Sequence, residues 1–383
     1  MTTVDVNLMA DLKRFGAADI NDCFSCGNCT AICPLADDDA VFPRSIIRLA
    51  QVGLKDQLVG AKELWTCYQC GMCTDRCPQQ ADPSEFMATA RRYAIAHYDK
   101  TRLARTLYTK PVIGVIIAVV AALFFAAFFQ TLKAGQGAPD KAVFGLNYSI
   151  IHTTGLVVMA IAVLFSAIGL VLLIRNIARR DGVTWASLLK GGKAWKRTWR
   201  ALWYAVGVES LGQKRYREDC VDDQPVEPLY RRRWLIHFLT LWGFLGLFLA
   251  TILNYLLDLL GIVDTGTWHP IYYPIRLLGT IAGLALMYGV TWFFVRRFEE
   301  RRAGTSTTKM TDWLFLTQLW LIGLTGFLIE LSLYLPGQHP WADWIFLVHA
   351  GIAMELILFL PFTKLAHVMY RPVSLFFYGL AKS

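Results

Sequence analysis

Eight of the nine cysteines lie within the first 77 residues, in two boxes of identical spacing. Both boxes, at residues 23–34 and 67–78, read C-x2-C-x2-C-x3-C-P. This spacing is typical of 4Fe–4S clusters: three closely spaced thiolates bind one cluster, and the fourth cysteine, followed by proline, binds the other. We therefore predict that one cluster is held by Cys23, Cys26, Cys29 and Cys77. The second cluster would be held by Cys67, Cys70, Cys73 and Cys33.

Two other uses of cysteine fit this pattern less well. Zinc sites take four ligands and rarely show three evenly spaced cysteines followed by Cys-Pro. Disulfides need an oxidising compartment, and the N-terminal residues do not resemble a secretory signal. Cys220 stands alone in a charged stretch, and we interpret it as a free surface thiol.

Histidines form a second set of candidate ligands. Of the seven, His97 falls in the cysteine-rich part, where we expect it to be solvated, and His269 and His339 fall between apolar segments. The other four lie inside apolar segments: His152, His237, His349 and His367. An ionisable ring in a membrane segment is a functional candidate because leaving it unpaired is costly.

The depths of these four histidines suggest two pairs. His152 and His349 fall near the outer ends of their segments, whereas His237 and His367 fall near the inner ends. His349 and His367 are 18 residues apart, so on one continuous helix they would share a face about 27 Å apart, although Pro361 would kink that helix. Such pairs would serve two b-type haems, each held by two imidazoles. The alternative is that some rings only form hydrogen bonds between helices.

Hydropathy sets the elements that must position these residues. The chain has 383 residues, 55% of them apolar, and a mean hydropathy of +0.40, which excludes an ordinary soluble protein. Six apolar segments have the roughly 20 residues needed to span a bilayer. They cover residues 111–132, 146–174, 234–260, 271–295, 313–335 and 342–370. We therefore expect a soluble domain at 1–105 and a membrane domain at 106–383.

Charge predicts the orientation of the chain. Residues 1–105 hold 12 basic and 13 acidic residues, a net of −1, whereas the remaining 26 basic and 16 acidic residues give +10. The connections at 175–233 and 296–309 carry 14 and 5 Lys and Arg, and the other three carry only Lys133 and Lys141. Because basic loops stay inside, we predict a multi-pass protein of the cytoplasmic membrane with the iron–sulfur domain and both termini in the cytoplasm. The positive charge therefore needs no nucleic acid.

The predicted fold class is all-α. Residues 43–52 read as a short helix, and Asp82-Pro83-Ser84-Glu85 reads as the start of a helix that runs to about residue 97. No strand pattern appears. We expect an α-helical ferredoxin-like domain followed by a six-helix transmembrane cytochrome b bundle.

Other residues give weaker signals. Trp195, Trp199 and Trp203 recur every four residues among basic residues, which predicts an amphipathic helix in the membrane interface, or alternatively a docking surface for a soluble partner. Four charged residues lie in or near the spans: Arg276, Lys364, Glu330 and Glu355. The two basic residues could meet haem propionates or extend to the interface, and the two acidic ones are candidates for proton handling near a quinone.

At this point the chain resembles known families. The cysteine boxes are similar to those of the small iron–sulfur subunit of heterodisulfide reductases. The membrane part resembles the dihaem cytochrome b subunit of respiratory nitrate reductases, through residues 234–244 (WLIHFLTLWGF) and 360–367 (LPFTKLAH). The fusion of both resembles the membrane subunit of the quinone-interacting membrane-bound oxidoreductase (Qmo) complexes of sulfate reducers. That resemblance implies two soluble flavin and iron–sulfur partner subunits, with adenylylsulfate reductase as the downstream acceptor.

The chain departs from these families in two respects. The nitrate-reductase cytochromes carry two histidines on an early helix, whereas here His152 and His237 lie on separate segments, which makes His152 the weakest ligand candidate. The CCG motif of the heterodisulfide-reductase catalytic subunit does not occur, so no substrate-reducing site is evident. The chain would carry electrons.

These inferences lead to a hypothesis with two alternatives. Menaquinol would be oxidised near the outer haem, and electrons would pass through the inner haem and the clusters to soluble flavoproteins. In the first alternative the flow is reversed and reduces quinone or methanophenazine, because ligand types alone do not fix potentials. In the second, the chain is an anchor whose clusters are structural or redox-sensing.

Overall fold

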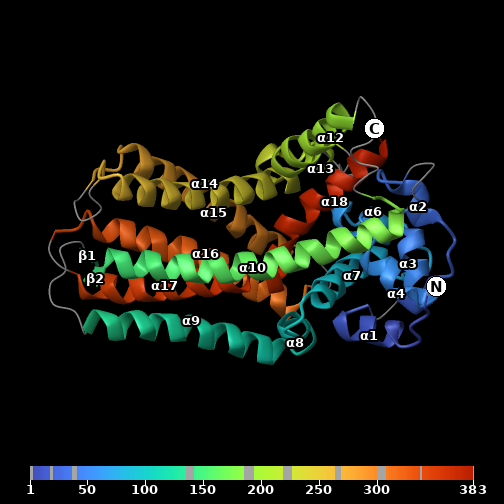
Figure 1. Ribbon diagram of the computed structural model, residues 1–383, viewed down its shortest axis with the longest axis horizontal. Coiled ribbons are helices and arrows are strands. Elements are labelled where there is room, and N and C mark those ends of the chain that lie inside the picture. Colours follow the sequence, from blue (N-terminus) through green and yellow to red (C-terminus); the bar gives the residue numbers. More distant parts are fainter. Residues whose placement is uncertain are drawn as a thin grey trace.

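The computed structural model describes residues 3–17, 20–36, 41–134, 142–184, 194–218, 227–263, 269–299, 308–336 and 339–382. Cys220 lies outside these ranges, so its predicted state is not addressed. The molecule is elongated, with long helices at one end and short helices at the other (Figure 1). Both termini lie at the end with the short helices (Figure 1).

The N-terminal part consists of short helices, as the sequence predicts. They are α1 (Leu8–Phe15), η1 (Ile20–Asp22), α2 (Asn28–Ile32), α3 (Arg44–Gln51), α4 (Lys55–Val59), α5 (Glu63–Thr66), α6 (Met72–Asp75), α7 (Pro83–Tyr98) and α8 (Leu103–Thr109). The predicted start of α7 is confirmed, because the Asp82 carboxylate accepts a hydrogen bond from the Glu85 N–H at 3.1 Å and Pro83 occupies the first turn. No strand occurs in the described residues of this part.

Among the residues that the structure describes, six helices are long and apolar enough to cross a membrane. These helices are α9 (Pro111–Ala134), α10 (Tyr148–Asp181), α14 (Arg233–Leu259), α15 (Pro274–Glu299), α16 (Met310–Ser332) and α17 (Pro340–Phe359). A two-residue hairpin of β1 (Ala142–Val143) and β2 (Leu146–Asn147) precedes α10. The six helices indicate a multi-pass membrane protein, as predicted.

The last span differs from the expectation of one continuous helix over 342–370. Helix α17 ends at Phe359 and is followed by two 3-10 turns, η4 (Leu360–Phe362) and η5 (Lys364–Ala366), before α18 (His367–Lys382) begins. Pro361 causes the break, because its ring clashes with the preceding turn and it has no N–H to donate. Thr363 is extended, with φ −111° and ψ −175°. The idea that His349 and His367 share one helix face is therefore wrong.

The described residues between α10 and α14 form α12 (Ala194–Trp203), a π-helical segment η2 (Tyr204–Leu211), α13 (Lys214–Glu218) and the turn η3 (Leu229–Arg231). The predicted amphipathic helix is present as α12, with Trp195, Trp199 and Trp203 exposed by 75%, 55% and 63%. Helix α12 packs against α18 at the end that carries the short helices (Figure 1).

One apolar core joins the N-terminal part to the membrane helices. It contains Leu8, Trp65 and Tyr98 together with Ile177 of α10 and Tyr370 of α18. The Tyr370 ring contacts Trp65 and Tyr98 edge to face, with centroids 5.0 and 5.6 Å apart. This shared core fixes the cysteine boxes relative to the membrane helices.

Candidate functional site

The two cysteine boxes have the same backbone conformation. Gly27 and Gly71 both have φ +94° and precede the short helices α2 and α6, which contact each other. Ser25 and Gln69, two residues before them, also have positive φ, at 63° and 56°. Glycine is needed at positions 27 and 71, because a residue with a Cβ is disfavoured at φ +94°.

The cysteines gather in two sets of four. The pKa of the Cys29 thiol is raised by burial and then by its neighbours Cys23, Cys26 and Cys77. The pKa of Cys73 is likewise raised by burial, then by Cys67, Cys70 and Cys33, and least by Cys29 of the other set; burial raises the pKa of Cys33 to about 12. Each set contains three cysteines of one box and the fourth cysteine of the other. The spacing predicts sets of the same composition, and the assignment of ligands to each cluster stays a prediction.

A cavity lies inside the second set. It is lined by Cys33, Cys67, Cys70 and Cys73 with apolar neighbours that include Phe42 and Met87. Among the residues that the structure describes, no three His, Cys, Asp or Glu side chains converge closely enough for a single metal ion. Thiols spread around a cavity fit a polynuclear cluster better than a zinc ion. In the first set Cys26 is exposed, and the neighbouring Phe24 is 61% exposed.

Arginines surround the second box, a feature that the sequence alone does not predict. Arg371 of α18 donates to the carbonyl oxygens of Trp65 at 2.8 Å and Cys67 at 3.3 Å. Arg91 donates to the Cys67 oxygen at 2.6 Å. Arg233 of α14 donates to the Cys70 oxygen at 2.9 Å. Positive charge beside a cluster favours its reduced, more negative state. No local pattern marks these residues, because their partners are distant in sequence.

The structure brings the predicted inner histidine pair together. The rings of His237 and His367 have centroids 6.5 Å apart. Two imidazoles bound to one iron need roughly this spacing, because each metal–nitrogen bond is about 2 Å long and each nitrogen lies about 1 Å from its ring centre. His237 Nδ1 is 3.0 Å from Gln213 Oε1, and His367 Nδ1 is 2.6 Å from the Lys364 carbonyl oxygen. Since Nδ1 donates in both, each Nε2 remains available as a ligand.

The predicted outer histidines do not contact each other. His152 stacks on Tyr255 at 4.7 Å, and its Nδ1 lies 3.0 Å from the Tyr148 carbonyl oxygen. His349 Nδ1 lies 2.9 Å from Thr325 Oγ1, whose hydroxyl donates to a backbone carbonyl. Both rings therefore also keep Nε2 available. All four histidines that the sequence predicts as haem ligands share this arrangement.

A cavity of about 380 Å³ opens beside His349, between α14, α15, α16 and α17. Its lining is mainly apolar, with Arg276 and Glu330 as its charged residues. These two form an ion pair at 2.6 Å. A cavity of this size and lining is typical of sites for organic cofactors or ligands. Arg276 and Glu330 therefore form a charged part of the cavity wall.

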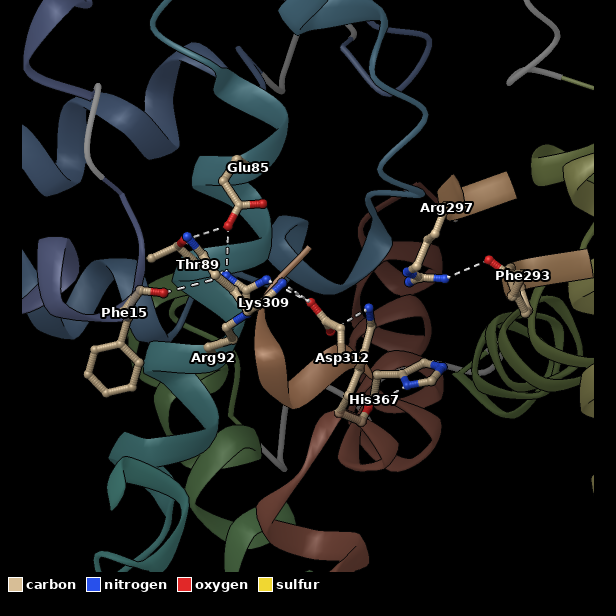
Figure 2. Close-up of polar contacts among 10 residues, drawn as sticks. Phe15, Glu85, Thr89, Arg92, Phe293, Arg297, Lys309, Asp312 and His367 are labelled. Carbon is tan, nitrogen blue, oxygen red and sulfur yellow. Dashed lines mark hydrogen bonds and ion pairs between the residues drawn. The ribbon is translucent and has the colours of Figure 1, made fainter. Parts of the chain in front are cut away.

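A buried charge network lies near His367 (Figure 2). Arg92 of α7 pairs with Glu85 at 2.8 Å and with Asp312 of α16 at 3.3 Å. Asp312 also pairs with Lys364 at 3.0 Å. This network ties the iron–sulfur part to the membrane helices.

Glu355 is a separate buried carboxyl group in the membrane. It is 1% exposed and lies 2.5 Å from the Gln318 amide of α16. An intramembrane carboxyl group with a single polar partner marks a functional candidate.

Two family models match the sequence of the chain. The model described as Citrate utilization protein B matches residues 98–381, and the model described as 4Fe-4S dicluster domain matches residues 19–81. The second range contains all eight cysteines of the two boxes. The N-terminal part is therefore an iron–sulfur domain with 4Fe–4S clusters.

Individual relatives cover the two parts unequally. Citrate utilization protein B of Escherichia coli is 28% identical over 303 residues, which are 77% of this chain and 74% of that protein. One subunit of the H2:CoB-CoM heterodisulfide,ferredoxin reductases of Methanothermobacter thermautotrophicus and M. marburgensis is 38% identical over 56 residues, 15% of this chain and 30% of each relative. The chain thus spans less than a third of those two proteins. No solved structure matches.

Proposed function

The chain belongs to the Citrate utilization protein B family, and from this membership and the sites described above we propose that it is a membrane electron-transfer subunit of a quinone-interacting oxidoreductase. Residues 1–105 would form the two-cluster domain and residues 106–383 a dihaem membrane domain. The observation that carries the proposal is the His237–His367 pair, with ring centroids 6.5 Å apart, next to an iron–sulfur domain. Haem, when bound, supplies one-electron redox chemistry inside the membrane.

The chain's own residues have defined tasks in this proposal. The two sets of four cysteines hold the clusters. Gln213 and the Lys364 carbonyl orient the imidazoles of the inner pair through their Nδ1 atoms. His349 and His152 provide the outer ligands, and the cavity beside His349 takes the cofactor, with Arg276 placed to meet a carboxylate. His152 stacks on Tyr255 and does not line this cavity, so its assignment as the second outer ligand rests on its predicted depth.

Two directions of electron flow are candidates. The name of the Escherichia coli relative connects that protein with citrate utilization. Oxidation of an organic acid releases electrons, which favours flow from a soluble flavoprotein through the clusters and haems to quinone. The opposite flow, from menaquinol to two flavin and iron–sulfur subunits and on to adenylylsulfate reductase, follows from the resemblance to the membrane subunit of Qmo complexes. In both cases the basic connections favour a cytoplasmic iron–sulfur domain.

An anaerobic visible spectrum of the purified protein tests the proposal. We expect a haem α-band that grows on reduction, together with iron and sulfide for two clusters. His367→Leu should remove one haem and leave the clusters, whereas His269→Leu, in a connecting segment, should change neither. Absence of haem from the wild-type protein would refute the proposal. Reduction of the haem by a menaquinol analogue indicates the quinol-oxidising direction, and reoxidation of pre-reduced haem by a menaquinone analogue indicates the other.

A further inference from the structure

An aromatic side chain of the second cysteine box faces the membrane domain. Tyr68 directly follows Cys67, and its ring is stacked on Tyr216 of α13, with centroids 5.2 Å apart and planes 2° apart. The Arg371 guanidinium carbon lies over the same ring, 4.1 Å from its centroid. The Tyr68 hydroxyl donates to the Glu209 carboxylate. Three separate elements thus hold one phenol ring in place.

The series of rings continues to the inner histidine pair. Tyr216 meets His237 edge to face, with centroids 5.7 Å apart and planes at 88°. His237 in turn faces His367 at 6.5 Å. Neighbouring rings therefore connect the backbone at Cys67 to the site where we place the inner haem.

The sequence provides specific supports for this arrangement. Glu209 is 1% exposed and lies in the π-helical segment η2, a distortion that frequently occurs at functional sites. The His237 ring is fixed by Gln213, which is 3% exposed and lies one residue before α13. Both ends of the ring series are thereby restrained.

We propose that Tyr68 and Tyr216 form the electron-transfer bridge between the second cluster, held by Cys33, Cys67, Cys70 and Cys73, and the inner haem site. This inference rests on the proposed function. Electron tunnelling slows steeply as the gap between redox groups widens, and packed rings close that gap better than empty space does. One electron leaves a reduced cluster and enters an oxidised haem iron, or the reverse. Both tyrosines begin and end the step as neutral phenols, and no proton is transferred.

A second route is available and gives the bridge a competitor. Arg233 donates to the Cys70 carbonyl oxygen at 2.9 Å and lies one helical turn before His237 on α14. That route crosses a hydrogen bond and several covalent bonds of the helix. The ring series differs from the Arg233 route in one respect. A substitution at Tyr216 interrupts the series without replacing any cysteine or histidine ligand.

Four variants of the full chain in lipid nanodiscs test the bridge. Tyr216→Leu removes the ring, and Tyr216→Phe keeps it. Tyr68→Phe keeps the ring and removes the hydrogen bond to Glu209. Tyr230→Leu is the matched control, because Tyr230 is 54% exposed and packs on Trp292 away from the series. Electrons are injected photochemically into the clusters, and the haem α-band is followed in time. Haem content, cluster EPR spectra and the midpoint potentials of both groups are measured in parallel.

We expect Tyr216→Leu to slow transfer by at least about tenfold, equivalent to about 1.4 kcal/mol in the barrier, at unchanged potentials and EPR spectra. Tyr216→Phe and Tyr230→Leu should stay within about twofold of the wild type. Tyr68→Phe should stay in the same range, because its ring remains. A wild-type rate in Tyr216→Leu with intact haem and clusters would overturn the bridge and assign transfer to the Arg233 route. If Tyr216→Leu loses haem, the same transfer rate is measured in Tyr68→Leu, and the same criterion of about tenfold applies. Absence of haem from the wild type would instead refute the proposed function.

Discussion

The junction between the iron–sulfur domain and the membrane helices depends on Asp312. Arg92, Glu85 and Asp312 have side chains only 8–9% exposed, so their charges are poorly hydrated. Removing one partner of such a buried pair costs about 3–5 kcal/mol. The cost is smaller here for two reasons. Arg92 still has Glu85 as a partner at 2.8 Å when Asp312 is changed, and the Lys364 side chain is 46% exposed, so water can hydrate its charge. We therefore expect Asp312→Asn to cost about 2–3 kcal/mol of local stability.

Hydrogen exchange of α7 measures this cost directly. A loss of about 2–3 kcal/mol should accelerate exchange of the α7 amides roughly 30- to 150-fold, because these amides exchange by local opening. Arg14→Gln is the control, because the exposed Arg14–Asp11 pair lies on α1, next to α7, and such pairs contribute little. The triple variant Glu85→Gln/Arg92→Met/Asp312→Leu, which replaces all three buried charges of the network, should recover most of the loss. Exchange unchanged in Asp312→Asn would show that the network does not hold the junction.

The remaining predictions concern the clusters, the inner pair and pH. Cys73→Ser should lose about half of the iron, while the EPR spectrum of the first cluster persists; loss of neither cluster would contradict the grouping. Gln213→Leu should shift the midpoint potential of the inner haem without changing haem content, since it removes the acceptor of His237 Nδ1; an unshifted potential would contradict that role. Burial, then Lys55, lowers the pKa of His97 from about 6.5 to about 4, so the folded state binds fewer protons than the unfolded state between these values. The domain should therefore be fully stable above about pH 6.5 and lose stability as pH falls toward 4, and thermal unfolding of His97→Gln should show a weaker loss.

Local sequence signals were sufficient for much of the fold. The start of α7 depends on Asp82, Pro83 and Glu85, which are adjacent in sequence, and the structure follows them. Hydropathy located the six candidate spans, because membrane length is a strong constraint. It did not show that α17 ends at Phe359, since a membrane helix continues past a proline only where neighbours satisfy the freed backbone groups. The expectation that His97 is solvated was also wrong, because this ring is partly buried against Tyr98.

The candidate site divides in the same way. The groupings around Cys29 and Cys73 are predicted from spacing, because three ligands of each cluster lie in one short segment and the cysteine before proline binds the other cluster. The meeting of His237 and His367 followed from depth alone, although the assumed helix was wrong. Arg371, Gln213 and Tyr216 could not be found in this way. Arg371 reaches Trp65 across 306 positions, and no periodicity or motif encodes a contact at that separation.

The shared core also imposes an order on synthesis. Tyr98 is translated with the iron–sulfur domain, but Tyr370, which packs against it, follows 272 positions later. At about 5–20 residues per second, the ribosome needs roughly 15–50 s to cover that distance. During this interval the nascent domain lacks the part of its core that α18 provides. Only a chain in which α18 has emerged can close this core, so maturation of the domain waits for the translation of α18.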